Sequence, residues 1–238
     1  MKAYILRIDS PISKKYASMT AESCRLQGIP WEYFEGYQNM RGGWAWGLTG
    51  IDLKISEGRP FKWPKIANPP HEPNLPSGEK AECCTAGHAA IWKKIADGED
   101  DVGIVLEHDA VMLHKLDGIE IPDGFIVVLG YKVTDPHNYM FLDAGAPSEL
   151  IDITGHEGAH AYAMTKKTAK MMIEEIETKG RLGCVDNAYF IKGQRSTSIP
   201  LKIASPTAAI GWIRESTIWA ASANVNYEFI PSFANYYK

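Results

Sequence analysis

The chain has 238 residues and a formal net charge of −4, with 45% hydrophobic and 23% charged residues. This composition is ordinary for a soluble globular protein, and the length is enough for one large domain with a substantial core. The chain lacks the excess of basic residues that would indicate a nucleic-acid or anionic-membrane partner. No apolar segment is long enough to cross a bilayer.

The first part of the chain predicts two strands and a helix, followed by a long irregular segment. Residues 3–8 form an apolar run that is too short for a signal peptide and is expected to be a strand. Residues 13–27 are predicted to be a helix that Gly28 ends, and 31–34 a second strand. Residues 38–78 are rich in Trp, Pro and Gly, so this insertion is expected to lack long regular elements.

The remainder alternates between strand and helix patterns. Thr165 is a plausible N-cap, and Gly180 is a plausible helix end. The expected elements are a helix over 80–96, strands over 102–106, 125–129, 150–153 and 161–164, helices over 165–177 and 187–191, and a strand over 199–203. This alternation predicts an α/β fold with a mostly parallel sheet and helices on both faces.

Two acids follow the most apolar strand. Glu107 and Asp109 are spaced i, i+2 where the strand over 102–106 is expected to leave the sheet. Open α/β sheets bind ligands in the crevice at this end of their strands, and carboxylates are the oxygen ligands that Mg²⁺ and Mn²⁺ prefer. The pair therefore indicates a metal–nucleotide site, and the alternative is a solvated acidic loop.

The four cysteines form no C-x-x-C pair, and Cys83 and Cys84 are adjacent. Neighbouring cysteines do not easily form a compact bridge, so free thiols in a reducing cytoplasm are expected.

Three sequence blocks together resemble glycosyltransferase family 25, the lipopolysaccharide-type and collagen galactosyltransferase-like domain. They span residues 78–190, about half of the chain, and Asp186 resembles the acid that lies beyond the third block. The blocks are Cys84–His88 with Ile91–Ile95, Val105–Ala110, and Gly158–Tyr162 with Lys166–Lys170.

The resemblance implies one GT-A-like (Rossmann-like) domain over residues 1–238, in which 38–78 form an insertion and acceptor-side lid. The implied reaction is transfer of a sugar from a nucleotide-sugar, a UDP-sugar, to a hydroxyl acceptor with inversion. The implied cofactor is Mn²⁺ or Mg²⁺, and the acceptor is a surface glycan such as lipopolysaccharide.

The resemblance also assigns roles to individual residues. Asp109 and Glu107 would hold the metal, and Asp186 would be the general base, its alternative role being a helix cap. Arg7, Asp9, Glu107, His88 and His160 are the candidates for donor binding. Trp44, Trp46 and Trp63 either stack on the acceptor through their flat rings or anchor the insertion to the core.

The chain departs from the family pattern at three places. His108 replaces the middle acid of the family's acidic block and is either an added metal ligand or a side chain that points away. Gly87 replaces a serine before His88, and residues 7–9 stand where the family has an Asn-Leu motif.

Three more functions are compatible with the sequence. His156-Glu157-x-x-His160 matches the H-E-x-x-H motif of zinc metallohydrolases, although Gly155 and Gly158 disfavour the helix that this chemistry needs. The second function is that of a transferase that acts on hydroxylated bases of phage-type DNA. The third is that of a non-catalytic, glycan-binding relative of the transferases.

Overall fold

A seven-stranded mixed sheet is the centre of the fold. The computed structural model describes residues 1–238 except 55–59, 62–69, 134–145, 157, 181–183 and 213–238. The sheet has the strand order β2-β1-β5-β10-β7-β11-β9, and all its strands except β10 and β9 run in one direction. Its strands are β1 (Lys2–Arg7), β2 (Trp31–Glu35), β5 (Val102–Glu107), β7 (Ile126–Val128), β9 (Glu149–Ile153), β10 (Ala161–Thr165) and β11 (Leu201–Ser205).

The helices begin and end where local sequence signals place them. The Ser10 side chain accepts a hydrogen bond from the Ser13 N–H, and the Thr165 side chain accepts one from Thr168. Gly28 and Gly180, which follow two of the helices, have φ values of 65° and 82°, which favour glycine. The helices are α1 (Pro11–Leu26), α2 (Gly42–Leu48), α3 (Ser77–Asp97), α4 (Lys166–Lys179) and the short π-helical η2 (Asp186–Phe190).

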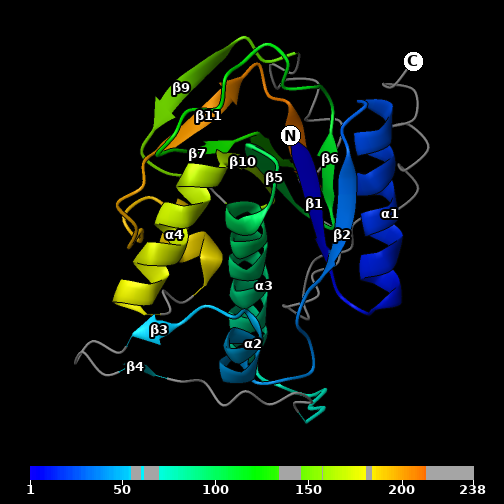
Figure 1. The fold of residues 1–238 in the computed structure, drawn as a ribbon. Helices are drawn as coiled ribbons and strands as arrows, with labels where there is room; N and C mark the ends of the chain where they lie inside the picture. Colours follow the sequence, from blue (N-terminus) through cyan, green and yellow to red (C-terminus); the bar gives the residue numbers. More distant parts are fainter. Residues whose placement is uncertain (55–59, 62–69, 134–145, 157, 181–183, 213–238) are drawn as a thin grey trace.

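Helices cover both faces of the sheet. Figure 1 shows α1 on one side of the strands and α3 and α4 on the other. The side chains of the sheet are accordingly divided between two cores, one containing Ala17 and Cys24 of α1 and the other containing Trp92 of α3 and Met172 of α4. The expected α/β class, with a mostly parallel sheet between helices, is confirmed.

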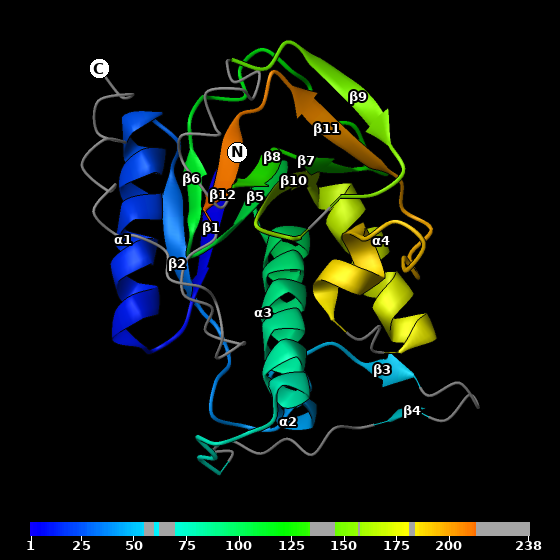
Figure 2. The ribbon, with the colours of Figure 1, turned by 180° about the vertical axis from the view of Figure 1, so that it is seen from behind.

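Two smaller sheets complete the described fold. Strands β6 (Ala110–Met112), β12 (Ala209–Trp212) and β8 (Gly130–Val133) form a three-stranded sheet on the α1 side, visible in Figure 2. Strands β3 (Leu53–Lys54) and β4 (Pro60–Phe61) pair within the insertion. The sequence did not predict β6, β8 or β12, because strands of three or four residues are too short to show a period.

The insertion and the residues after Asp186 differ from expectation in detail. In the described part of residues 38–78, the short helix α2 packs on α3. The helix expected over 187–191 is instead a π-helical turn that starts at Asp186 itself.

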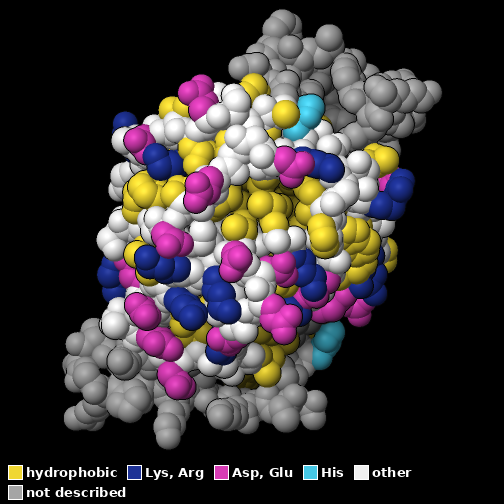
Figure 3. Space-filling model, turned by 45° about the horizontal axis from the view of Figure 1, so that its top comes forward, with side chains coloured by type: hydrophobic (Ala, Val, Ile, Leu, Met, Phe, Trp, Pro, Cys, Tyr) yellow, Lys and Arg dark blue, Asp and Glu magenta, His cyan; other side chains and the backbone are white. Residues whose placement is uncertain are grey.

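The visible surface carries charges of both signs. On the face in Figure 3, acidic and basic side chains are interspersed around a band of apolar ones. This face has no single-sign field of the kind that attracts nucleic acid. Among the described helices, none combines the length and apolar character that a membrane span requires.

Candidate active site

The candidate site lies at the carboxyl ends of β1 and β5 in the main sheet, where the chain order of the strands reverses. Strands β1 and β5 are parallel neighbours, and the chain continues from them toward opposite sides of the sheet. Strand β10 is antiparallel to β5 with Ala161 opposite Leu106, so its first residues return to the edge at which β5 ends. Such a switch point at the carboxyl ends of strands is the usual ligand site of open α/β sheets.

A chain of hydrogen bonds connects Glu107, at the end of β5, to the interior. Glu107 Oε1 lies 3.3 Å from His88 Nε2, and His88 Nδ1 lies 2.8 Å from the Tyr162 hydroxyl. The Trp92 indole N–H donates to that hydroxyl at 2.7 Å. Burial raises the pKa of Tyr162 well above its usual value, so the hydroxyl keeps its proton.

Cys84 adds a thiol to this group. Its sulfur, a His88 ring nitrogen and a Glu107 carboxylate oxygen all lie within 4.8 Å of one another. Cys84 and His88 are four residues apart on α3 and therefore share a helix face. The sequence predicted a metal near Glu107, and these three side chains are a group that could hold one.

Asp109 follows Glu107 in the turn between β5 and β6. The Thr20 hydroxyl of α1 fixes this turn, with its oxygen 2.8 Å from the His108 carbonyl and 2.6 Å from the Ala110 carbonyl. Asp109 Oδ1 is shielded from solvent. Glu107 and Asp109 thus follow one another closely at the end of β5, and carboxylates are the donor class suited to Mn²⁺ or Mg²⁺.

His108 points to the opposite side of the sheet from Glu107. Its ring stacks on Tyr16 of α1 with a centroid distance of 6.3 Å and an interplanar angle of 15°. Glu107 instead contacts His88 of α3. His108 was expected to be either an added metal ligand or a side chain that points away from the site. The structure favours the second interpretation, because the His108 ring lies on the α1 side of the sheet and Glu107 on the α3 side.

Asp186 reaches the same edge from η2. The Ala159 N–H donates to its Oδ1 at 2.7 Å, and the neighbouring Val185 N–H donates to the Thr85 hydroxyl of α3 at 2.9 Å. The Asp186 side chain is not a helix cap, since Val185 has that position and makes no side-chain cap. Burial raises the pKa of Cys184, and the charges of Asp186 and Glu107 raise it further, which places this thiol near both carboxylates.

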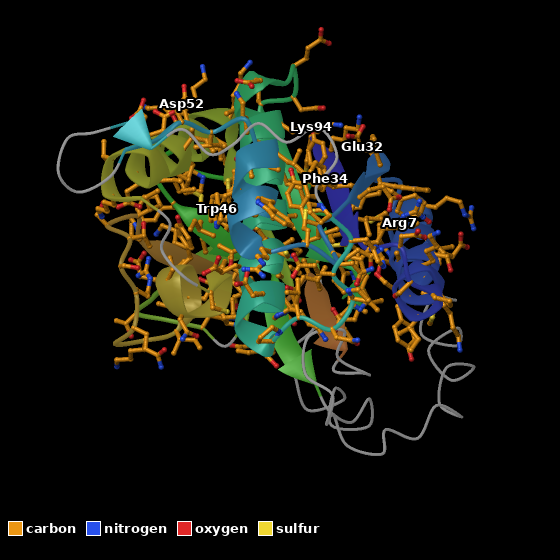
Figure 4. All side chains as sticks on the ribbon, turned by 90° about the horizontal axis from the view of Figure 1, so that it is seen from below. Arg7, Glu32, Phe34, Trp46, Asp52 and Lys94 are labelled. Atoms are coloured by element: carbon orange, nitrogen blue, oxygen red, sulfur yellow. The ribbon has the colours of Figure 1, made fainter. Side chains whose placement is uncertain are left out.

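Arg7 and Asp9 lie at the end of β1 and have partners of their own. The Arg7 guanidinium pairs with Glu35 and lies 3.6 Å from the centre of the Tyr33 ring, on the β2 side. Asp9 pairs with Lys14 in α1. Figure 4 shows Arg7 on this outer side of the sheet.

His160 lies behind the edge rather than in an open crevice. It is fully buried, and its Nε2 lies 3.0 Å from the Gly130 carbonyl oxygen. Its ring centroid is 5.5 Å from that of His156. Both histidines precede β10 in a non-helical segment where Gly158 has a φ of 89°, and Glu157 lies outside the described residues. The zinc-hydrolase interpretation is therefore wrong, because it needs both histidines on one helix face.

The three tryptophans of the insertion differ in position. Trp46 is 1% exposed and belongs to the core on the α3 side of the sheet (Figure 4). Its ring therefore anchors the insertion to the core and is not exposed for stacking on an acceptor. Trp44 is partly exposed, and Trp63 lies outside the described residues.

Sequence reasoning missed Cys184 and the roles of Cys84 and Tyr162. The i, i+4 spacing of Cys84 and His88 was a readable signal, because such residues share one helix face. No comparable signal marked Cys184, since its place beside Asp186 and Glu107 depends on how the segment at η2 packs against α3 and β10.

Comparison with known proteins gives matches among solved structures alone. No family model and no curated protein matches the chain. It is similar to an active-site mutant of LgtC, at 12% identity and TM-score 0.46, over 99% of this chain and 95% of that one. It is also similar to the galactosyltransferase LgtC in complex with donor and acceptor sugar analogues, at 12% identity and TM-score 0.41, over 100% and 95%.

A third structure is the apo form of the glycosyltransferase GlyE of Streptococcus pneumoniae TIGR4, at 10% identity and TM-score 0.33, over 73% of this chain and 37% of that one. At TM-scores of 0.33 to 0.46, these similarities establish neither a family nor an activity for this chain.

Proposed function

We propose that the protein is a GT-A-like glycosyltransferase that moves a sugar from a nucleotide-sugar, a UDP-sugar, to a hydroxyl acceptor. The observation that carries the proposal is that the thiol of Cys184 lies near both Glu107 and Asp186, while Asp109 lies in the turn directly after Glu107. Asp186 is bound to Ala159 at the start of β10, and Ala161 lies opposite Leu106 of β5. The resemblance of three sequence blocks to glycosyltransferase family 25 supports the same activity.

Asp109 and Glu107 would hold the Mn²⁺ or Mg²⁺ of this reaction. The bound ion supplies charge neutralisation for the diphosphate that leaves. The chain's own contribution is to fix the turn that carries Asp109, through Thr20, and to orient Glu107, through His88. Glu107 has an exposed fraction of 21%, so ligands can reach it from solvent.

Asp186 is the proposed general base. The base must accept the proton of the acceptor hydroxyl as the sugar carbon is attacked, and a carboxylate suits this role in an inverting reaction. One of its oxygens already accepts the Ala159 N–H, which fixes the side chain. The other oxygen is the proposed proton acceptor.

The remaining predicted residues fit outer parts of the donor and acceptor sites. Arg7 and Asp9 lie at the end of β1 and are proposed contacts for the nucleotide. His88 and His160 are fully buried, so we propose that they orient neighbouring groups instead of touching phosphate directly. Residues 38–78, with the partly exposed Trp44, are the proposed acceptor-side lid of a single domain over 1–238.

A surface glycan such as lipopolysaccharide is the proposed acceptor, by resemblance alone. A hydroxylated base in phage-type DNA is the second acceptor to test, and a non-catalytic glycan-binding protein is the alternative without chemistry.

The test is a thermal-shift panel of nucleotide-sugars with and without Mn²⁺. A donor that binds the native state alone raises the melting temperature. At a concentration of 100 times its Kd, it adds about 2.7 kcal/mol to the free energy of unfolding. We expect a shift with one UDP-sugar that depends on Mn²⁺ or Mg²⁺, followed by slow metal-dependent hydrolysis of that donor. A complete panel without a shift, at millimolar donor and metal, would overturn the proposal.

A further inference from the structure

Three side chains of different donor chemistry converge beside the carboxylate pair. We infer that Cys84, His88 and Glu107 form a binding site for a divalent cation of intermediate softness, Zn²⁺ in the first place. The donor atoms are one sulfur, one ring nitrogen and one carboxylate oxygen, all within 4.8 Å of one another. This site goes beyond the proposed function, which places a hard cation at Asp109 and Glu107; Glu107 is common to the two sites, and Cys84 and His88 belong to the zinc site alone.

The donor set decides which ion fits. Thiolate and imidazole favour Zn²⁺, whereas Mg²⁺ and Mn²⁺ favour carboxylate, carbonyl and water oxygens. Zinc ligand bonds of about 2.0–2.3 Å place the donor atoms of a tetrahedral site about 3.5 Å apart. The observed spread of up to 4.8 Å therefore has to close by about 1 Å, which the partly exposed Cys84 and Glu107 side chains can do by rotation.

The surroundings of His88 support a ligand role for its Nε2. Histidine ligands usually hydrogen-bond through the ring nitrogen that does not bind the metal. Here Nδ1 lies 2.8 Å from the Tyr162 oxygen, whose position the Trp92 N–H fixes at 2.7 Å. In the loaded site Nδ1 would carry the proton and donate to the Tyr162 oxygen, and the Nε2 lone pair would bind the cation beside Glu107, whose Oε1 lies 3.3 Å away.

Charge balance supports the same ion. A thiolate and a carboxylate together neutralise a dication, and the imidazole ligand is neutral, so the loaded site has no net charge. Neutrality matters because His88 is 0% exposed, and uncompensated charge is costly to bury. Three protein ligands leave a fourth position for water or a substrate group, as in catalytic zinc sites.

The chain offers a matched control in the adjacent thiol. Cys83 is buried, and its sulfur donates to the Met40 carbonyl at 3.1 Å, away from Glu107. Neither cysteine is in a disulfide.

The test uses the full chain, stripped of metal and loaded with Zn²⁺ or Co²⁺. We expect one tightly held zinc per chain by elemental analysis after dialysis. We also expect a thiolate-to-cobalt charge-transfer band in the near ultraviolet for the Co²⁺ protein. Cys84→Ser should remove the band, and both Cys84→Ser and His88→Gln should weaken zinc binding by at least about tenfold. Cys83→Ser and Asp109→Asn should retain both the band and the zinc.

Two results would overturn the inference. One is a wild-type protein that holds no zinc after dialysis and gives no thiolate band, a result that does not depend on any variant folding. The other is a band that persists in Cys84→Ser or disappears in Cys83→Ser. These experiments distinguish failure of the zinc site from failure of the proposed function. Zinc binding without any nucleotide-sugar shift would overturn sugar transfer alone. Mn²⁺-dependent transfer without zinc binding would overturn the zinc site alone.

Discussion

The Asp186 carboxylate accepts a hydrogen bond from the Ala159 N–H at 2.7 Å, which joins two segments 27 residues apart. This bond places the carboxylate beside the first residues of β10, at the edge where β5 ends in Glu107. The contact is the structural basis for assigning Asp186 a role in the site rather than in its own helix.

Replacing Asp186 by Asn is expected to stop transfer and to leave donor binding intact. The amide keeps an oxygen for the Ala159 N–H but cannot accept the acceptor's proton, so the rate should fall by about 10²–10⁴-fold. Steady-state transfer and the donor-induced thermal shift measure the two effects. Asp152→Asn, at an exposed carboxylate that pairs with Lys202, is the control. Normal turnover by Asp186→Asn would exclude it as the base.

Replacing Asp109 by Asn is expected to remove the metal dependence of donor binding. The substitution keeps the size of the side chain and removes its charge, so the turn held by Thr20 should persist. Transfer should fall about 100-fold or more, since a metal supplies several kcal/mol of charge stabilisation. Isothermal titration with Mn²⁺ and UDP-sugar measures the loss. Asp117→Asn, an exposed acid nearby in the chain, should behave as wild type; an unchanged Mn²⁺ response of Asp109→Asn would refute the metal assignment.

Replacing Tyr162 by Phe is expected to destabilise the core. The Trp92 N–H and His88 Nδ1 would each lose their partner, and both side chains are 0% exposed. A buried polar group left without its hydrogen bond costs about 1–3 kcal/mol of the free energy of unfolding, which urea denaturation measures. Tyr131→Phe, at a ring that is 43% exposed, is the control and should change little. A loss for Tyr162→Phe no greater than the control's would contradict the hydrogen-bond chain.

Glu175 gives the fold a pH-dependent contact between α4 and the segment before β11. Burial raises the pKa of Glu175, but hydrogen bonds from Lys179, Thr197 and Ser198 outweigh it, so the pKa lies below the usual 4.5. A carboxyl with a lowered folded pKa stabilises the protein above 4.5, and this contribution is lost as the pH falls through the folded value. The stability difference between wild type and Glu175→Gln should therefore shrink below about pH 4.5.

Chemical denaturation at a series of pH values checks this expectation. Glu174→Gln, at the exposed neighbouring position, is the matched control. A difference between wild type and Glu175→Gln that stays constant down to pH 3 would show that the three hydrogen bonds do not stabilise the ionised form.

Local elements were predictable because their signals lie within a few residues. The N-cap Thr165 and the following helix were expected and are present, since capping depends on a side chain and an N–H three residues later. The buried strands β5 and β10 were also expected from their apolar runs. The π-helical turn at Asp186 was not, because its hydrogen bonds to Ala159 and, through Val185, to Thr85 come from distant segments.

The parts of the site were predictable as residue types but not as a group. Glu107 and Asp109 were identified from their place after a buried strand, and His88 was expected on the buried side of its helix. The partners of Glu107 could not be read, because they depend on α3 packing against β5 and on β10 entering between β5 and β7.

By itself, the amino-acid order determined the alternating elements, their caps and the acids at a strand end, since each depends on interactions over a few residues. Only the tertiary structure decided that a thiol, an imidazole and a carboxylate from α3 and β5 share one small volume, and that His108 turns away from them. The physical reason is that side chains distant in the chain meet through strand register and helix packing, which depend on the burial of the whole apolar surface at once.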